Sequence, residues 1–290
     1  MPGQRRHSIS NVVRLNPLAA YWNNAVGGWG RPCPLPYIHP DDLTYLETIG
    51  YWKKRPHPKR NLNFDSFLQD PSFGKIDSEF YFSLLPLPYM GNLAKADIFV
   101  LLLNPGFDYV DLYAQGHRDF RRSIIRNLKQ DFGQEEFPFA FLNPEYCWHG
   151  GFVYWERRLR GVLKVFEDSA LMFSKGDNHP NGYFRALKAM ANRIAAIELV
   201  PYHSRSFNAA RLAKGLPTAK IARTFVTEHV LPRVRKREAL LVVTRSSQYW
   251  GLGTLSGSYV CYAGFETRNA SLTPASRGGK AILEWIGDHP

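Results

Sequence analysis

From residue 96 onward, short apolar runs alternate with longer amphipathic stretches, and this alternation restricts the folds open to the chain. The apolar runs predict strands over 97–103, 195–201, 239–244 and 259–265. The amphipathic stretches predict helices over 119–131, 152–167, 182–193, 218–233 and 277–286. Strands that alternate with helices favour an α/β fold. We expect a three-layer α/β/α sandwich with a central, mostly parallel, four-stranded sheet.

The first third of the chain has a different character. It contains many turn signals, among them those in 31–36 and 56–58, and it shows no long helical period. We therefore expect residues 1–94 to form an irregular N-terminal region packed on the core, and residues 95–290 to form the α/β domain.

Composition narrows the class of protein. The chain has 290 residues and is 44% hydrophobic, which is enough to bury a full core. It contains no apolar run of the roughly 18 residues that a membrane span needs. Its three cysteines, Cys33, Cys147 and Cys261, are far apart and form no paired motif. We expect a cytoplasmic monomer with no membrane partner, no metal and no cofactor.

The charge balance points to a polyanionic partner. The net charge is +12, and basic residues gather in segments 53–60, 118–129 and 233–237. Such clusters suit contacts to phosphates, which dominate nucleic-acid affinity. Aromatic residues make up 14% of the chain and can stack on unpaired bases. We expect double-stranded DNA as the partner, with Arg122 and Arg126 among the residues that contact it.

The apolar run 97–103 ends abruptly at Asn104-Pro105-Gly106. Pro105 cannot continue a strand, so the chain must leave the sheet at Asn104. Ligands of open α/β sheets bind at the carboxyl ends of strands. The run therefore indicates a buried strand that delivers one amide to a site, although an ordinary junction between a strand and a loop has the same pattern.

Two further motifs make the pattern more specific. Phe137-Pro138-Phe139-Ala140 follows the Asn-Pro-Gly turn, and an aromatic helix start at 152–155 follows that. Together they resemble the mismatch-specific (thymine/uracil) branch of the uracil-DNA glycosylase superfamily. The resemblance implies that Asn104 positions the water that attacks the sugar and that Phe139 stacks on the flipped base. It also implies that Gly106 and Phe107 line the base site.

The C-terminal third follows the order of elements in the same family, and the resemblance covers roughly residues 95–290. It implies that Asn269 faces the leaving base and that the loop behind it enters the minor groove. The residues that would contact DNA in this part of the chain are Arg245, Ser271, Ser276 and Arg277.

Departures from the family suggest an unusual substrate. Glu198 stands where several branches place an asparagine that reads the pyrimidine edge, and a carboxylate suits the N4 amine of cytosine. A shift of one residue would instead leave Glu198 in a salt bridge. Gly106 replaces a tyrosine that excludes substituents at C5 in uracil-restricted members. We therefore expect a 5-modified cytosine, such as a hydroxymethyl or glucosylated base of phage DNA, and a role in antiviral defence.

Two more residues have both a functional and a structural interpretation. Asp108 would be a general base if its loop folds back, or a residue that caps a turn or forms a salt bridge. His203 follows the middle strand and would contact substrate or phosphate, or would be a packed, hydrogen-bonded histidine.

Other functions stay open at this point. One is repair of uracil or thymine mismatches by the same reaction, and another is non-catalytic nucleic-acid binding by the same fold. A third is an unrelated α/β enzyme acting on a small phosphorylated or nucleotide substrate, although no Gly-rich phosphate loop follows any predicted strand.

Overall fold

The computed structural model describes most of the chain. The described ranges are 16–26, 36–54, 63–70, 73–74, 80–167, 180–207, 210–245, 247–252, 259–263, 266–269 and 271–289. Of the sequence-predicted features, the basic cluster at 53–60 and the turn-rich segment at 31–36 lie largely outside these ranges, as does all of segment 56–58.

Five strands form one mixed sheet in the described residues. They are β1 (Tyr89–Met90), β2 (Ile98–Leu102), β3 (Ile194–Glu198), β4 (Leu240–Val243) and β5 (Val260–Cys261). Their order is β1-β3-β2-β4-β5. The last four run parallel to one another, and β1 pairs antiparallel with β3. The α/β class is confirmed, but the sheet has five strands rather than four.

The inner strands owe their apolar sequence to burial on both faces. Every residue of β2 is buried, as are the first four residues of β3 and the last three of β4. Parallel strands covered by helices on both sides have continuous hydrophobic runs rather than alternation. The extra strand β1 has only two residues and therefore produces no such pattern.

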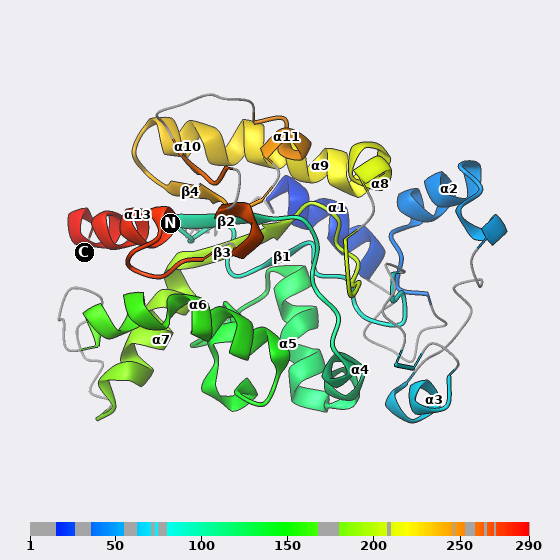
Figure 1. Cartoon of the computed structure of the whole chain (residues 1–290), viewed down its shortest axis with the longest axis horizontal. Coiled ribbons are helices and arrows are strands. Elements are labelled where there is room, and N and C mark those ends of the chain that lie inside the picture. The colour runs from blue at the N-terminus through cyan, green and yellow to red at the C-terminus, as the bar shows by residue number, and fades with distance from the viewer. Residues whose placement is uncertain are drawn as a thin grey trace, which may run out of the picture.

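Helices cover both faces of this sheet (Figure 1). On one face lie α9 (Pro217–Phe225) and α10 (Leu231–Arg235), which a π-helical turn at Val226–Val230 joins. On the other face lie α5 (Arg118–Lys129), α6 (Gly150–Phe166) and α7 (Gly182–Arg193). Helix α13 (Arg277–Asp288) packs against β4, β5 and α6. Four of the predicted helical ranges each coincide with one helix, and the range 218–233 spans α9, the π-helical turn and the start of α10.

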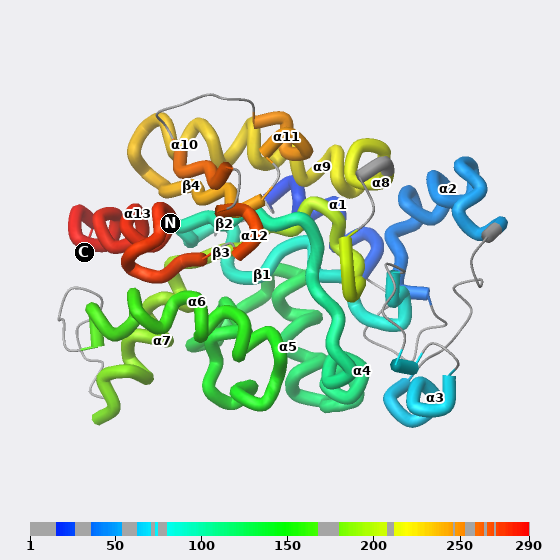
Figure 2. The backbone as a smooth tube through the Cα atoms, in the orientation of Figure 1, coloured from blue at the N-terminus to red at the C-terminus, as the bar shows by residue number. Residues whose placement is uncertain are grey.

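The N-terminal region is helical where an irregular chain was expected. It contains α1 (Pro17–Val26), α2 (Pro40–Thr48), a 3₁₀ turn at Tyr51–Lys54 and α3 (Phe64–Leu68). Proline begins α1 and α2, because its missing N–H costs nothing in the first turn. Helix α1 packs against both α5 and α9 (Figure 2). Its Trp22 is fully buried in the main core.

Short elements complete the fold. They are α4 (Tyr109–Gly116), two 3₁₀ turns at Ala140–Leu142 and Pro144–Tyr146, α8 (Ala210–Gly215), α11 (Ser247–Trp250) and α12 (Glu266–Asn269). Among the described residues, no helix combines the length and the apolar character needed to cross a membrane.

Candidate functional site

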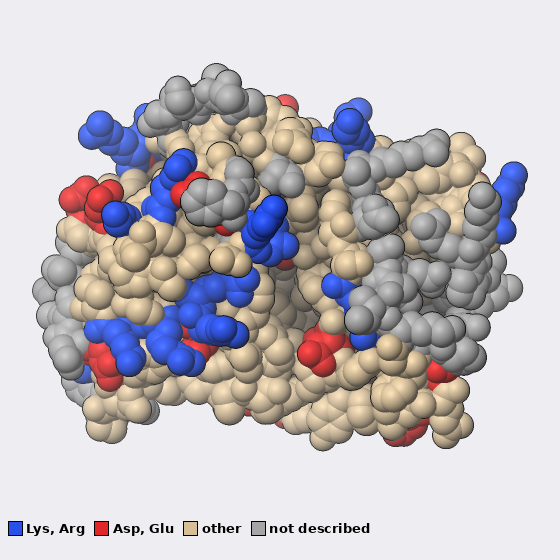
Figure 3. Space-filling view, in the orientation of Figure 1, with Lys and Arg blue, Asp and Glu red and all other residues tan. Residues whose placement is uncertain are grey.

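The carboxyl ends of three parallel strands bring polar side chains to one edge of the sheet. Leu102 of β2 pairs with Glu198 of β3, and Leu101 pairs with Val243 of β4. Asn104 and Arg245 come two residues after the ends of β2 and β4, so they lie at the same edge as Glu198. Figure 3 shows this face of the molecule hollowed between α6 and the chain that leads from β2 into α4.

Asn104 is oriented by its amide nitrogen. Nδ2 lies 2.8 Å from Ser204 Oγ, 2.9 Å from Pro105 O and 3.3 Å from Tyr202 O. These acceptors fix which end of the amide faces the protein. No described residue donates to Oδ1, and the side chain is only partly buried. The carbonyl oxygen is therefore free to accept a hydrogen bond from a water molecule or a substrate.

Gly106 leaves space beside Asn104. A Cβ atom added at this position would meet no atom within 4 Å, and the residue is exposed. Phe107, in contrast, is already engaged: its ring stacks on Tyr81 with centroids 3.6 Å apart and an interplanar angle of 7°. One face of Phe107 is thus occupied by the protein, whereas the side of the turn at Gly106 is open.

Asp108 acts as the N-cap of α4. Its side chain accepts a hydrogen bond from Val110 N at 3.4 Å, and Asp111 Oδ2 accepts one from Asp108 N at 2.7 Å. This reciprocal arrangement satisfies donors at the start of the helix. The capping interpretation describes the structure, and the role of general base stays a prediction.

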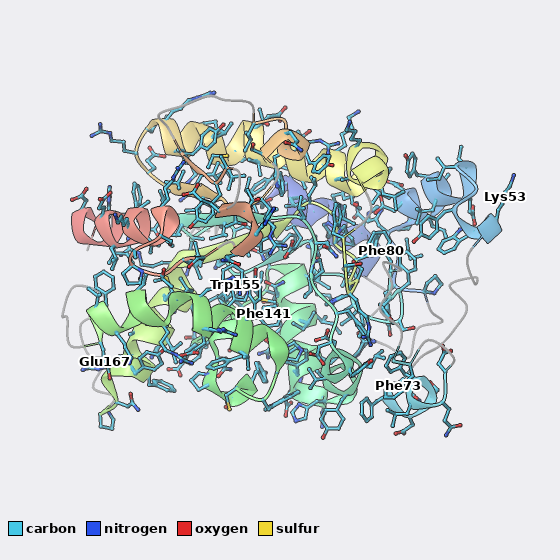
Figure 4. The ribbon with its side chains drawn as sticks, in the orientation of Figure 1. Lys53, Phe73, Phe80, Phe141, Trp155 and Glu167 are labelled. Atoms are coloured by element: carbon cyan, nitrogen blue, oxygen red, sulfur yellow. The ribbon has the colours of Figure 1, made fainter. Side chains whose placement is uncertain are left out.

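Phe139 does not lie where the sequence comparison placed it. Its side chain is 0% exposed. It packs edge-on against Trp155 at 4.9 Å and lies 6.4 Å from Phe141. Figure 4 labels these two neighbours, Trp155 and Phe141. A ring with no exposed surface cannot stack on a base, so the stacking role assigned to Phe139 is wrong for this structure. In this structure Phe139 of the Phe-Pro-Phe-Ala motif is a residue of the hydrophobic core.

We expect Phe139→Leu to lower the free energy of unfolding by less than about 1.5 kcal/mol and to leave DNA-dependent activity intact. The reason is that leucine fills most of the same core volume, whereas it could not replace a stacking ring. Urea denaturation and a base-release assay on the same preparation check both parts. Lost activity in a folded, equally stable variant would restore the stacking role.

Glu198 carries an unpartnered buried atom. Its Oε2 has no accessible surface and no hydrogen-bond partner, although the residue as a whole is only partly buried. Burial raises the pKa of this carboxyl well above its usual range, and the nearby charge of Arg245 opposes that effect only in part. The side chain forms no ion pair with any described residue. The salt-bridge alternative is therefore not what the structure shows.

The raised pKa predicts a specific pH dependence of stability. The pKa of Glu198 is higher in the folded than in the unfolded protein, so the protonated form of this carboxyl favours folding. This contribution to the free energy of unfolding is complete below the unfolded pKa near 4.5 and is lost as pH rises through the folded pKa. We expect Glu198→Gln to remove this loss and to be more stable than the parent protein at pH 8 but not at pH 4. Denaturant titrations at both pH values measure it, and parallel pH profiles would contradict it.

Arg245 lies near this carboxyl, and Arg158 in turn lies near Arg245. Arg158 lies on α6 with its guanidinium 3.5 Å from the centre of the Tyr154 ring. Its Nη2 donates to Asn269 O at 3.4 Å, and Arg245 Nη2 donates to Arg268 O at 3.3 Å. Both arginines are thus oriented by carbonyls at the C-terminus of α12, where cations are favoured. Figure 3 shows Lys and Arg side chains gathered over α6 and beside α12.

His203 is a structural residue. It is buried, with Nδ1 2.8 Å from Gly106 O and Nε2 3.2 Å from Leu85 O. Burial lowers the pKa of this imidazole, so the neutral ring donates to one of the two carbonyls. Of the two interpretations of His203, the structure shows the packed, hydrogen-bonded histidine, because both ring nitrogens face backbone carbonyls. His203 instead holds the turn at Gly106.

The two arginines expected on α5 are engaged with acids. Arg122 pairs with Asp119 at 3.0 Å and Arg126 with Glu135 at 3.4 Å. Both arginines are exposed, but no hydrogen bond or ion pair joins either to a described residue at the carboxyl edge. Their contact with DNA stays a prediction.

The C-terminal loop residues have mixed positions. Asn269 is exposed at the end of α12, and Ser271 Oγ interacts with Thr273. Ser276 caps α13, with Oγ accepting from Gly279 N at 3.1 Å. Arg277 pairs with Glu266 at 3.2 Å. No described residue forms a hydrogen bond with the Asn269 side chain, whereas Ser276 and Arg277 already have structural partners.

Sequence reasoning missed three residues of the site. Tyr154 and Arg158 are four residues apart on α6, so they share a helix face, and that spacing was the available signal. On the same helix, Glu156 is buried, and its carboxylate accepts hydrogen bonds from Arg160 and Tyr183. Ser204, the third missed residue, follows β3 in a loop and has no distinguishing pattern.

A buried carboxyl in the N-terminal region connects to the site. Asp42 of α2 is 0% exposed, and its Oδ2 accepts from Tyr202 Oη and Thr218 Oγ1, both at 2.6 Å. Its Oδ1 accepts from Thr218 N at 3.0 Å. Because Tyr202 O lies 3.3 Å from Asn104 Nδ2, the N-terminal region fixes the loop that orients the candidate catalytic amide.

Among the described residues, no group of three or more His, Cys, Asp or Glu is placed to hold a metal ion. Comparison with protein-family models, with curated proteins and with solved structures finds no match. Function must therefore be argued from the geometry of the site itself.

Proposed function

We propose that this protein is a DNA glycosylase built on a three-layer sandwich of the uracil-DNA glycosylase type. It flips a modified base out of double-stranded DNA and hydrolyses the N-glycosidic bond to leave an abasic site. The observation that carries the proposal is the orientation of Asn104, whose amide nitrogen is held by the protein and whose carbonyl oxygen is free at the carboxyl edge of the sheet.

The reaction needs no strong base. In the proposed mechanism, the oxygen of a water molecule held by Asn104 Oδ1 attacks C1′ of the sugar. The bond between C1′ and the base nitrogen breaks, and the base leaves with the bonding electron pair. The proton lost by the water is balanced by a proton taken up by the base. Positive charge develops on the sugar in the transition state, where a fixed carbonyl dipole stabilises it.

The base that we propose is a 5-substituted cytosine. Burial raises the pKa of Glu198, and in its protonated form this carboxyl would offer one donor and one acceptor, a pattern that fits N3 and the N4 amine of cytosine. This differs from the acceptor-only carboxylate expected from the sequence. The open space at Gly106 admits a substituent at C5. Hydroxymethylated or glucosylated cytosine of phage DNA is such a base, which supports a role in antiviral defence.

A neutral carboxyl can also pair with N3–H and O4 of uracil, so uracil and thymine mismatches belong in the same assay. The purified protein is incubated with duplexes that carry uracil, a thymine mismatch or a 5-substituted cytosine, and with DNA from phages with modified genomes. Alkali then reveals abasic sites. Cleavage confined to 5-substituted cytosines supports the proposal, whereas efficient release of uracil alone contradicts the proposed substrate.

One observation favours a second candidate, a non-catalytic nucleic-acid-binding protein. Phe139 is buried, so the ring assigned to hold the flipped base is missing from the site. DNA binding without abasic sites on any of these substrates would select this candidate.

A further inference from the structure

Arg158 and Arg245 are two cations without an anion. Neither forms an ion pair with a carboxylate among the described residues. The polar contacts that orient their outer nitrogens are backbone carbonyls, those of Tyr154 and Asn269 for Arg158 and that of Arg268 for Arg245. By contrast, Arg160, half a turn further along α6, binds Glu156 through two nitrogens.

The inner nitrogens of both side chains are unsatisfied. Arg158 Nε and Arg245 Nε have no accessible surface and no hydrogen-bond partner. A buried donor without an acceptor costs about 1–3 kcal/mol, so a ligand that reorients either guanidinium toward an acceptor would recover part of that cost. The two charges also interact: Arg245 and burial both lower the pKa of Arg158.

The nearest carboxyl does not neutralise this pair. Glu198 lies close enough for Arg245 to influence it, yet no hydrogen bond joins the two, and Glu198 Oε2 is itself without a partner. Three unsatisfied groups from α6, β3 and the end of β4 therefore meet at the edge where Asn104 lies. Exposed Arg157 and Arg268 add further positive charge beside them.

We propose that Arg158 and Arg245 form a phosphate-binding site that holds the backbone phosphate next to the flipped nucleotide. That the phosphate lies next to a flipped nucleotide rests on the proposed function, whereas the binding of phosphate by the two arginines does not. Guanidinium groups bind phosphate oxygens through paired N–H donors. The Tyr154 ring packs against the guanidinium of Arg158. Hydrogen bonds to backbone carbonyls of α12 orient both guanidinium groups.

The test uses the full chain labelled with ¹⁵N-arginine, in which Arg158→Gln and Arg245→Gln assign the two Nε–H resonances. Inorganic phosphate and an unmodified DNA duplex are the two probes. We expect both probes to shift these two resonances and to leave that of Arg160 in place. Each substitution is expected to weaken DNA binding about tenfold and to reduce the slope of log affinity against log salt by about one.

Arg160→Gln is the matched control, because Arg160 is exposed on the same helix as Arg158 and is already bound by Glu156. This substitution should leave the Nε–H resonances of Arg158 and Arg245 in place and should leave DNA affinity close to that of the parent protein. Thermal unfolding of each variant verifies that it folds. If inorganic phosphate shifts the two Nε–H resonances but neither variant loses DNA affinity, the site does not bind a DNA phosphate. If neither probe shifts these resonances, the proposed phosphate site is also overturned. Loss of DNA affinity without abasic sites on any substrate would instead refute the proposed reaction and leave the phosphate site standing.

Discussion

Asn104→Ala is expected to lower the rate of abasic-site formation by at least about 100-fold while DNA affinity stays unchanged. Alanine removes the carbonyl oxygen that is free at the edge of the sheet and therefore the group that holds the attacking water. The affinity is spared because the phosphate contacts come from other residues. Single-turnover release of the base, together with binding by fluorescence anisotropy, measures the two quantities separately.

Ser204→Ala provides the graded comparison. It keeps Asn104 but removes the hydroxyl that lies 2.8 Å from its amide nitrogen, so the amide can rotate. We expect a loss of about tenfold in rate, smaller than for Asn104→Ala, because Pro105 O and Tyr202 O still accept from the amide. Full activity of Asn104→Ala on a confirmed substrate would eliminate the proposed role of this residue.

Asp42→Ala is expected to lower the free energy of unfolding by about 3–5 kcal/mol. The carboxyl of Asp42 accepts from Tyr202 Oη and from two donors of Thr218, all buried, and each orphaned donor costs about 1–3 kcal/mol. Because these costs overlap, the total lies below their sum. Urea denaturation followed by tryptophan fluorescence measures the change.

Asp41→Ala is the control for that experiment. Asp41 is the adjacent residue of α2, but its side chain is exposed and its bond to Tyr21 Oη lies at the surface. Its replacement should cost less than about 1 kcal/mol. Equal effects of the two substitutions would mean that the Asp42 network contributes little beyond the stability of α2 itself.

The sequence was most informative where the chain repeats a local pattern. The apolar runs located β2, β3 and β4, because strands buried on both faces must be apolar throughout. Once the strands are parallel, Asn104, Glu198 and Arg245 must come to one edge, since each stands at or just after a carboxyl end. The fold class and the location of the site were therefore predictable.

Side-chain environment was not predictable in the same way. Phe139 belongs to a motif that also suits an exposed ring, and only its packing against Trp155 shows that it is core. The Asp42 network joins residues 160 and 176 positions apart, so no local pattern indicates it. Helices α1, α2 and α3 were missed because each is short and the sequence between them is rich in proline.

The shortness of the outer strands has a further consequence. In the described residues, β1 and β5 each contain only two residues, and they are the two outermost strands of the sheet. An exposed edge strand is a template on which another chain can add a strand. A very short edge strand offers too few unpaired backbone N–H and C=O groups for such pairing. We therefore expect little edge-to-edge association between copies, even at the high concentrations that crystallisation or NMR requires.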